Sequence, residues 1–141
     1  MSSSADNRCP KCGKYSDHGD MCMKCATVPA ASQAKVQAKL LDKGVDVCIP
    51  TRENGPYDLL AKDAHGMWHH IQVKTAYETK EGVRVNISRT TSKGRKPYRA
   101  DEVDQFAVVH KDDVYLIPES EVHGVGRINI LSPCYRKWLL T

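Results

Sequence analysis

The sequence lacks any long apolar run, and no segment approaches the ~20 consecutive apolar residues that a membrane-spanning helix requires. Residues 1–6 are mostly polar and contain no apolar stretch that could form the core of a secretory signal peptide. We therefore expect a cytoplasmic protein that is neither secreted nor inserted in a membrane. A strong overall charge is also lacking, because the formal net charge is only +4. The distribution of charge along the chain is therefore more informative than its sum.

The chain has six cysteines, and four of them form two Cys-x-x-Cys pairs separated by nine residues. Two such pairs can surround one tetrahedral Zn²⁺ ion with four thiolates. A disulfide framework is the alternative, but it is not favoured without a secretory signal. His18 lies between the pairs and could replace one cysteine. Cys48 and Cys134 stand alone and are predicted to be small buried residues. The predicted zinc ligands are Cys9, Cys12, Cys22 and Cys25.

Length and composition predict one domain of ordinary size with a small appendage. Of the 141 residues, 40% are hydrophobic and 27% are charged, which is close to the average of a globular domain. Residues 1–28 are predicted to form a zinc knuckle or ribbon module, which is too short to bury a core without its metal. Residues 29–141 form the main domain, and residues 26–31 are expected to be a linker.

The main domain alternates between helical and strand-like segments. A helix is predicted from Ser32, a plausible N-cap, to Gly44, a favourable C-cap. Short helices are expected at 118–121 and 133–140. Strands are predicted at 45–49, 57–62, 67–74, 83–88, 106–110, 114–117 and 127–131. This order predicts the α/β class, with a mixed β-sheet flanked by helices.

The stretch 56–75 carries the residues most suited to chemistry. Two strand-like runs flank Asp63-Ala64-His65-Gly66, whose composition is typical of a tight turn, so a hairpin is predicted. The hairpin would bring Asp58 opposite the end of the second strand. Gln72 and Lys74 share one face there, because side chains alternate along a strand. An acid, an amide and a lysine would then form a candidate metal and phosphate site. Alternatively, Asp58 caps the hairpin and Lys74 is a solvated strand end.

A second informative segment, residues 89–99, carries five cations and no acid. Its Gly, Ser, Thr and Pro content predicts a loop. Such a loop suits the phosphate backbone of DNA, although it could also be simply solvated. Tyr98 could stack on a base or pack against the protein. Acids are concentrated at 101–121, and this segregation favours a nucleic-acid face. The predicted DNA-binding residues are Arg89, Lys93, Arg95, Lys96 and Arg99.

These features together resemble the PD-(D/E)XK nuclease superfamily. Asp58 lies fourteen residues before Gln72 and is followed by the Gln72-Val73-Lys74 element on the next predicted strand. The resemblance is closer to the intron-associated homing-endonuclease-like branch, in which Gln replaces the second acid. The segments 56–60, 71–75 and 104–118 carry that resemblance, which covers about residues 30–122. Archaeal Holliday-junction resolvases are wider relatives of similar fold.

The resemblance implies a restriction-endonuclease-like fold and hydrolysis of DNA phosphodiester bonds with Mg²⁺ or Mn²⁺, by a homing-type or junction-resolving enzyme. Asp58 would be the principal metal ligand, and the Gln72 amide and the Val73 carbonyl would be further ligands. Lys74 would be the catalytic lysine. The resemblance also implies a dimer or tetramer that acts on duplex or branched DNA, in the cytoplasm or associated with the nucleoid.

The sequence departs from the family pattern at Gln33, where a glutamate is common on the leading helix. Glu53, in the loop before Asp58, could supply the missing carboxylate. A second hypothesis is therefore a non-catalytic DNA-binding protein that keeps the nuclease fold. A third, a redox or zinc-storage protein that uses the paired cysteines, leaves the rest of the chain without a role.

Overall fold

The computed structural model describes residues 23–52, 55–91, 93–99 and 101–141. A central sheet has the strand order β1-β2-β3-β8-β9. Its neighbouring strands are antiparallel, except that β3 and β8 are parallel. The strands are β1 (Val47–Cys48), β2 (Leu59–Lys62), β3 (Trp68–Thr75), β8 (Gln105–His110) and β9 (Asp113–Pro118). This mixed sheet confirms the α/β class that the sequence predicts.

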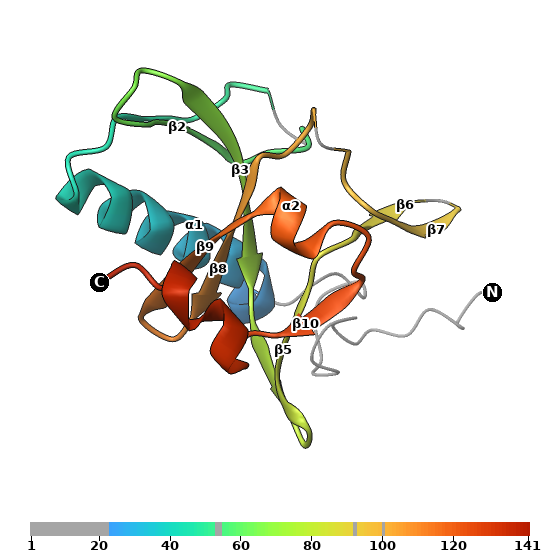
Figure 1. Cartoon of the computed structure of the whole chain (residues 1–141). Helices are drawn as coiled ribbons and strands as arrows, with labels where there is room; N and C mark the ends of the chain where they lie inside the picture. Colours follow the sequence, from blue (N-terminus) through green and yellow to red (C-terminus); the bar gives the residue numbers. More distant parts are fainter. Residues whose placement is uncertain (1–22, 53–54, 92, 100) are drawn as a thin grey trace. The chain divides into compact units, whose positions relative to one another are not determined.

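The helix α1 (Met23–Asp42) covers one face of the sheet with its residues 32–42 (Figure 1). Val36 and Leu40 are buried there in a core that includes Ile71 of β3. The helix ends as predicted: Gly44 has φ +75°, and the amides of Gly44 and Val45 donate to the carbonyls of Leu41 and Leu40. These two bonds form a Schellman motif.

Two expectations about the start of this helix are wrong. Residues 26–31, predicted as a linker, are helical, and α1 runs through Pro29. Ser32 is therefore inside the helix rather than at its N-cap. It is buried, and its Oγ lies 2.7 Å from Oγ1 of Thr75, so it links α1 to the end of β3. A side chain that bonds to another element satisfies its hydroxyl without a capping role.

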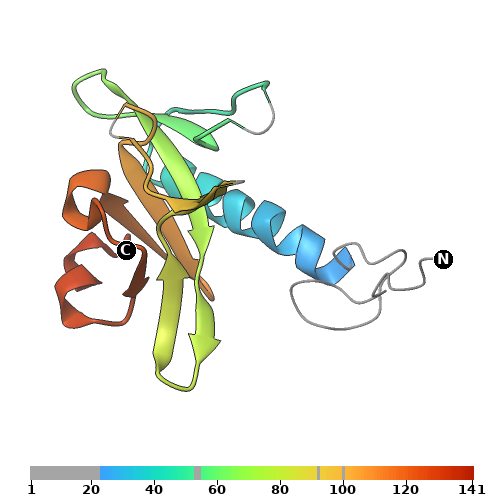
Figure 2. The same ribbon diagram turned by 90° about the vertical axis from the view of Figure 1, so that its right-hand side faces the viewer.

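The opposite face of the sheet packs against β5 and β10, which belong to a second sheet of order β10-β5-β4, and against the C-terminal helical segments (Figure 2). Phe106 and Ile117 of the central sheet are buried with Val85 and Ile128 of the second. The sequence predicts the strand at 83–88 but not that it belongs to a separate sheet. The covering elements are β5 (Gly82–Asn86), β10 (Arg127–Asn129), the short helix α2 (Glu119–Val122) and the 3₁₀ helix η2 (Pro133–Trp138), whereas β4 (Tyr77–Thr79) is exposed.

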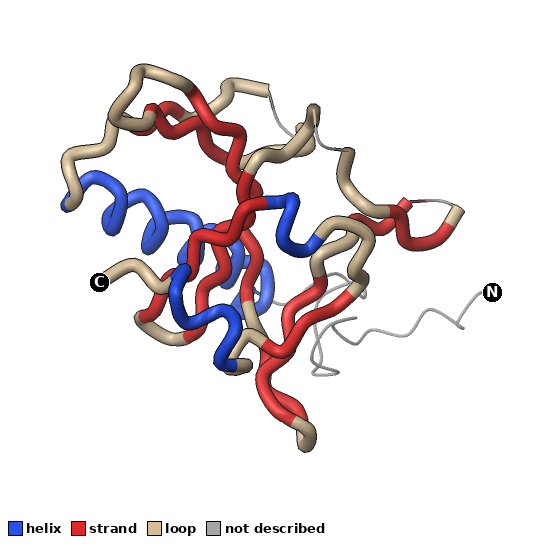
Figure 3. The backbone as a smooth tube through the Cα atoms, viewed as in Figure 1, coloured by secondary structure: helices blue, strands red, loops and turns tan. Residues whose placement is uncertain are grey.

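The basic segment differs from the loop that its composition predicts. It contains an antiparallel hairpin, β6 (Arg89–Thr91) and β7 (Gly94–Lys96), which lies away from the central sheet (Figure 3). Gly94 has φ +102° at the start of β7, a backbone conformation that strongly favours glycine. The glycine that argues for a loop therefore serves a tight hairpin turn.

The cysteine predictions have separate outcomes. Cys48 and Cys134 are exposed, so the prediction that they are buried is wrong. Cys48 lies on the edge strand β1, where Val47 takes the position that packs on the core. The predicted zinc ligands Cys9, Cys12 and Cys22 lie outside the described residues, as do His18 and Glu53, and Cys25 is described only by its backbone in α1.

Among the described helices, none is long and apolar enough to cross a membrane.

Candidate active site

The hairpin of β2 and β3 forms as predicted and sets the position of the candidate site. Its register ends with the pair Leu59 and Ile71, and Asp58 lies just before this pair, next to the Ile71–Val73 segment of β3. At the other end, Gly66 adopts φ +85° in the turn. Asp63 holds this turn, because its Oδ1 accepts hydrogen bonds from the amides of His65 and Met67. The turn fixes the register, and the register brings Asp58 to the Ile71–Val73 segment of β3.

Asp58 is half-buried just before β2 and is fixed by its backbone and side chain. Its N–H donates to the carbonyl of Ile71 at 2.8 Å, and its Oδ2 accepts from the N–H of Val73 at 2.9 Å. Burial raises the pKa of Asp58, while the bond from Val73 and the charge of Lys74 oppose that rise. The carboxylate is thus held against β3 but is costly to keep charged without a further cation.

Gln72 of β3 carries a buried side-chain oxygen. Its Oε1 has no hydrogen-bond donor within the part of the chain that the structure describes. Its Nε2 points toward the carbonyl of Val73 at 3.5 Å, a long contact. Buried polar atoms are nearly always paired, so this unpaired amide oxygen indicates a missing donor or cation. No group of three His, Cys, Asp or Glu side chains suited to a metal occurs among the described residues.

Lys74 lies further along β3 in a confined setting. Its Nζ donates to the hydroxyl of Tyr98 at 3.0 Å and lies 4.8 Å from the centre of the Tyr98 ring. Burial lowers the pKa of Lys74 to about 8, nearby Asp58 raises it, and the positive charge of Arg95 lowers it further. Burial thus disfavours the charged form of the amine. The amine interacts with Asp58, the predicted catalytic carboxylate.

A cavity of about 320 Å³ opens beside Asp58. Gln33, the helix position that departs from the family pattern, lines this cavity together with Asp58, whereas Gln72 and Lys74 are not among its lining residues. Arg52 and Tyr57 line it too, and the sequence analysis assigned a site role to neither, although Arg52 stands in the polar loop before Asp58 and Tyr57 directly precedes Asp58. The ring of Tyr57 stacks on His70, with centroids 4.4 Å apart. The cavity thus offers a cation and an aromatic surface next to the carboxylate.

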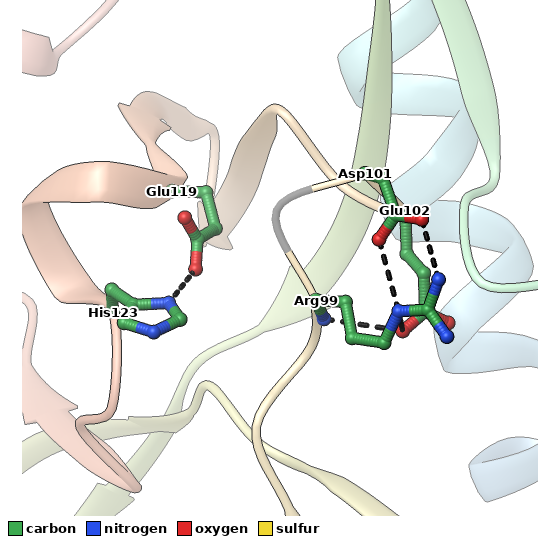
Figure 4. A network of polar contacts seen from close by, with 5 residues as sticks. All are labelled: Arg99, Asp101, Glu102, Glu119 and His123. Carbon is green, nitrogen blue, oxygen red and sulfur yellow. Dashed lines mark hydrogen bonds and ion pairs between the residues drawn. The ribbon is translucent and has the colours of Figure 1, made fainter.

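The predicted DNA-binding residues are not equivalent. Arg95 and Lys96 are exposed on β7, and Lys93 is exposed just before it, whereas Arg89 is described only by its backbone in β6. Arg99 instead lies against two acids, Asp101 and Glu102 (Figure 4). Its hydrogen bonds to Asp101 raise the pKa of Arg99. The charge of Arg99 is thus largely matched within the protein.

Tyr98 is buried and packs rather than being presented to solvent. Its ring meets Phe106 of β8 edge to face, with centroids 5.5 Å apart. Of the two roles that the sequence allows for Tyr98, packing is the one seen.

Comparisons with known proteins concern the family and the fold of the chain. A model of the PD-(D/E)XK endonuclease family matches residues 24–130, which include every element from α1 to β10. Among solved structures, the chain is similar to a bacterial homing endonuclease, I-Ssp6803I, with a TM-score of 0.63 and 21% sequence identity. That similarity covers 77% of this chain and 78% of the other, and at this identity it concerns the fold. No curated protein matches the sequence at a significant level.

Proposed function

Because the chain belongs to the PD-(D/E)XK endonuclease family, we propose that it is a DNA endonuclease that hydrolyses phosphodiester bonds with the help of Mg²⁺ or Mn²⁺. The observation that carries the proposal is the hydrogen bond from the Val73 amide to Asp58, which holds the carboxylate beside the Gln72-Val73-Lys74 segment of β3. These residue types bind a hard cation and stabilise charge on phosphorus.

The donor set fits a hard divalent cation. The Asp58 carboxylate supplies charge, and the buried Oε1 of Gln72 supplies an oxygen that has no donor among the described residues. The carbonyl of Val73 is the third candidate ligand. Mg²⁺ commonly binds through one or two carboxylates and keeps several waters, so a set with one carboxylate is sufficient but weak. When bound, the ion would act as a Lewis acid toward the phosphate and would acidify a coordinated water.

The side chains around the metal position have distinct roles in this proposal. Lys74 would hold the attacking water in place and would stabilise the negative charge that develops on the phosphate. Its confinement by Tyr98 suits that role, because a fixed cation needs little reorganisation during the reaction. Arg52, which lines the cavity beside Asp58, would meet the phosphate of the bound strand.

The experiment that tests this proposal is cleavage of supercoiled plasmid and of a four-way junction, with Mg²⁺, with Mn²⁺ and with EDTA. Metal-dependent cleavage would establish the nuclease. Preference for the junction would identify a resolvase, and sequence-dependent cutting of the plasmid would identify a homing-type enzyme. Because both strands of a duplex must be cut, we expect a dimer or tetramer, which sedimentation of the full chain would measure.

A second candidate function, a non-catalytic DNA-binding protein, is favoured by one observation. Gln33 lines the cavity next to Asp58 without the negative charge that the family commonly places there. If the wild type binds DNA but does not cut it, the variant Gln33→Glu tests whether the missing carboxylate is the cause. Cleavage gained by this variant would show that the missing carboxylate inactivated an otherwise intact site.

We propose that the exposed cations of the β6–β7 hairpin contact the DNA backbone. The double variant Arg95→Ala/Lys96→Ala should weaken DNA binding about tenfold near 0.1 M salt and reduce the salt slope by about two. Fluorescence anisotropy across a KCl series measures both. Arg99→Ala is the matched control, because its charge is already paired with Asp101 and Glu102. An equal loss from the control would contradict the assignment.

We also propose that residues 1–28 form a zinc module, with Cys9, Cys12, Cys22 and Cys25 as ligands. Cys9→Ser should lower the zinc content from one ion per chain to less than about half, because serine is a poor ligand for zinc. Atomic absorption on the purified protein measures this. Cys134→Ser, which changes an exposed cysteine far along the sequence, should leave the zinc content unchanged. Equal zinc in both variants would refute the module.

A further inference from the structure

Tyr98 confines the side chain of Lys74 and is itself held in the core of the central sheet. It follows the basic hairpin in the sequence, and it is buried against Phe106 of the central sheet. Its hydroxyl accepts a hydrogen bond from the amine of Lys74 at 3.0 Å. The segment that carries the DNA-binding cations is therefore tied directly to the proposed catalytic lysine.

Lysine needs such a tie, because its side chain has four rotatable bonds and loses considerable rotamer freedom when it is fixed. Two contacts restrict Lys74: the hydroxyl of Tyr98 as acceptor, and the face of the same ring 4.8 Å from Nζ. Both favour the ammonium at that place. The ring itself is held by its edge-to-face contact with Phe106, which is almost fully buried.

The other charged groups near Lys74 come from different elements. Asp58 precedes β2 and attracts the ammonium, whereas Arg95 on β7 repels it. A free lysine side chain would turn toward Asp58 and away from Arg95. The hydroxyl of Tyr98 offers a neutral acceptor that fixes the ammonium between these two charges without neutralising it.

We propose that Tyr98 is a positioning residue for cleavage, whose hydroxyl holds the Lys74 ammonium at the place where the scissile phosphate binds. The inference rests on the proposed endonuclease function and adds to it a residue outside the family motif. Tyr98 does not touch the substrate in this proposal. It acts only through Lys74.

The test compares Tyr98→Phe with wild type in two measurements. Phenylalanine keeps the ring, and so the packing on Phe106, and removes only the hydroxyl. We expect kcat for DNA cleavage to fall about tenfold, with KM for DNA unchanged, because substrate binding does not involve the hydroxyl. Tyr77→Phe is the matched control: it removes an exposed hydroxyl that donates to Asn86 on the second sheet, and it should leave kcat unchanged.

The second measurement does not depend on activity. In ¹H–¹⁵N spectra, a lysine ammonium that is held by a hydrogen bond gives a resolved signal, and a mobile one exchanges with water. The Lys74 signal, assigned by its absence in Lys74→Met, should be present in wild type and in Tyr77→Phe and be lost in Tyr98→Phe. A Tyr98→Phe variant with wild-type kcat and an intact ammonium signal overturns the inference.

The two measurements separate this inference from the proposed function. If wild type cuts no DNA, the endonuclease proposal fails, and the ammonium signal alone decides whether Tyr98 positions Lys74. Loss of that signal in Tyr98→Phe supports the positioning role, and its persistence refutes it. If Tyr98→Phe lowers kcat but Tyr77→Phe lowers it equally, the loss is general and the inference is refuted.

Discussion

Asp58→Asn is expected to reduce metal-dependent DNA cleavage by about a thousandfold or more. Asparagine keeps the size of the side chain and an oxygen that can accept the bond from the Val73 amide, so the local fold should persist. It removes the one carboxylate of the proposed metal site, and a neutral set of amide and carbonyl oxygens binds a divalent cation poorly. Single-turnover cleavage over a Mg²⁺ titration measures the loss.

The matched control for this prediction is Asp63→Asn, at the other end of the same hairpin. The asparagine side chain in this control would still accept hydrogen bonds from the turn amides through its Oδ1, and Asp63 lies far along the hairpin from Gln72. We therefore expect cleavage by this control to stay within about threefold of wild type. Wild-type cleavage by Asp58→Asn would remove Asp58 from the site. Rescue of Asp58→Asn by a large excess of Mn²⁺ would instead strengthen its role as a ligand.

The β2–β3 hairpin could be predicted from the sequence because the determinants of its structure are local. Asp63 and Gly66 specify the turn, and the alternation of side chains then specifies which residues share a face. The end of that register brings Asp58 beside the Ile71–Val73 segment of β3, where its backbone and side chain are hydrogen-bonded. Gly44 is a second local signal, since a glycine after an apolar helical pattern is typical of a helix end.

Contacts between distant segments could not be predicted in the same way. Lys74 and Tyr98 are 24 residues apart, and their contact depends on where the basic hairpin joins the sheet. The pairing of Arg99 with Asp101 is local, but composition alone reads a run of cations as free charge. The second sheet brings β10 beside β5, a pairing across about forty residues that neither strand's pattern indicates.

The exposed cysteines show how residue-type averages mislead at particular places. Cysteine is commonly buried, but Cys48 lies on a two-residue edge strand and Cys134 on a 3₁₀ helix in which no residue is buried. Both elements are too short to show a hydrophobic period. The basis for the prediction was therefore the residue type alone, and local geometry overrode it.

The buried ammonium of Lys74 lowers the free energy of unfolding at neutral pH. Burial lowers the pKa of its amine to about 8, from 10.5 in a solvated lysine. The folded protein therefore binds the Lys74 proton less tightly than the unfolded chain does. The free energy of unfolding therefore rises as the pH increases from about 8 to 10.5. In this range the unfolded chain still binds the Lys74 proton, whereas the folded protein has lost it. At neutral pH the buried charge destabilises the folded protein. A catalytic role would explain why the sequence has a lysine at this position.

Lys74→Met should therefore separate stability from activity. Methionine fills a similar volume without a charge, so we expect the thermal midpoint at pH 7 to rise by about 4 °C, or about 1 kcal/mol, after allowing for the lost attraction to Asp58. Cleavage should fall by about a thousandfold or more, while DNA binding stays within about threefold of wild type. Calorimetry, single-turnover cleavage and anisotropy measure the three quantities. A variant that cuts like wild type would exclude Lys74 from the mechanism.

The pH dependence distinguishes the charged role of Lys74 from that of a neutral base. If the ammonium stabilises the phosphate, the cleavage rate of wild type should fall as the pH rises through about 8, where Lys74 loses its proton. If the neutral amine takes a proton from water, the rate should rise through the same range. Lys74→Arg gives the control, because arginine keeps its charge throughout and should abolish this limb of the profile.

The increase in thermal stability caused by Lys74→Met should become smaller as the pH rises from about 8 to 10.5. In that range wild type no longer carries the buried charge that the substitution removes.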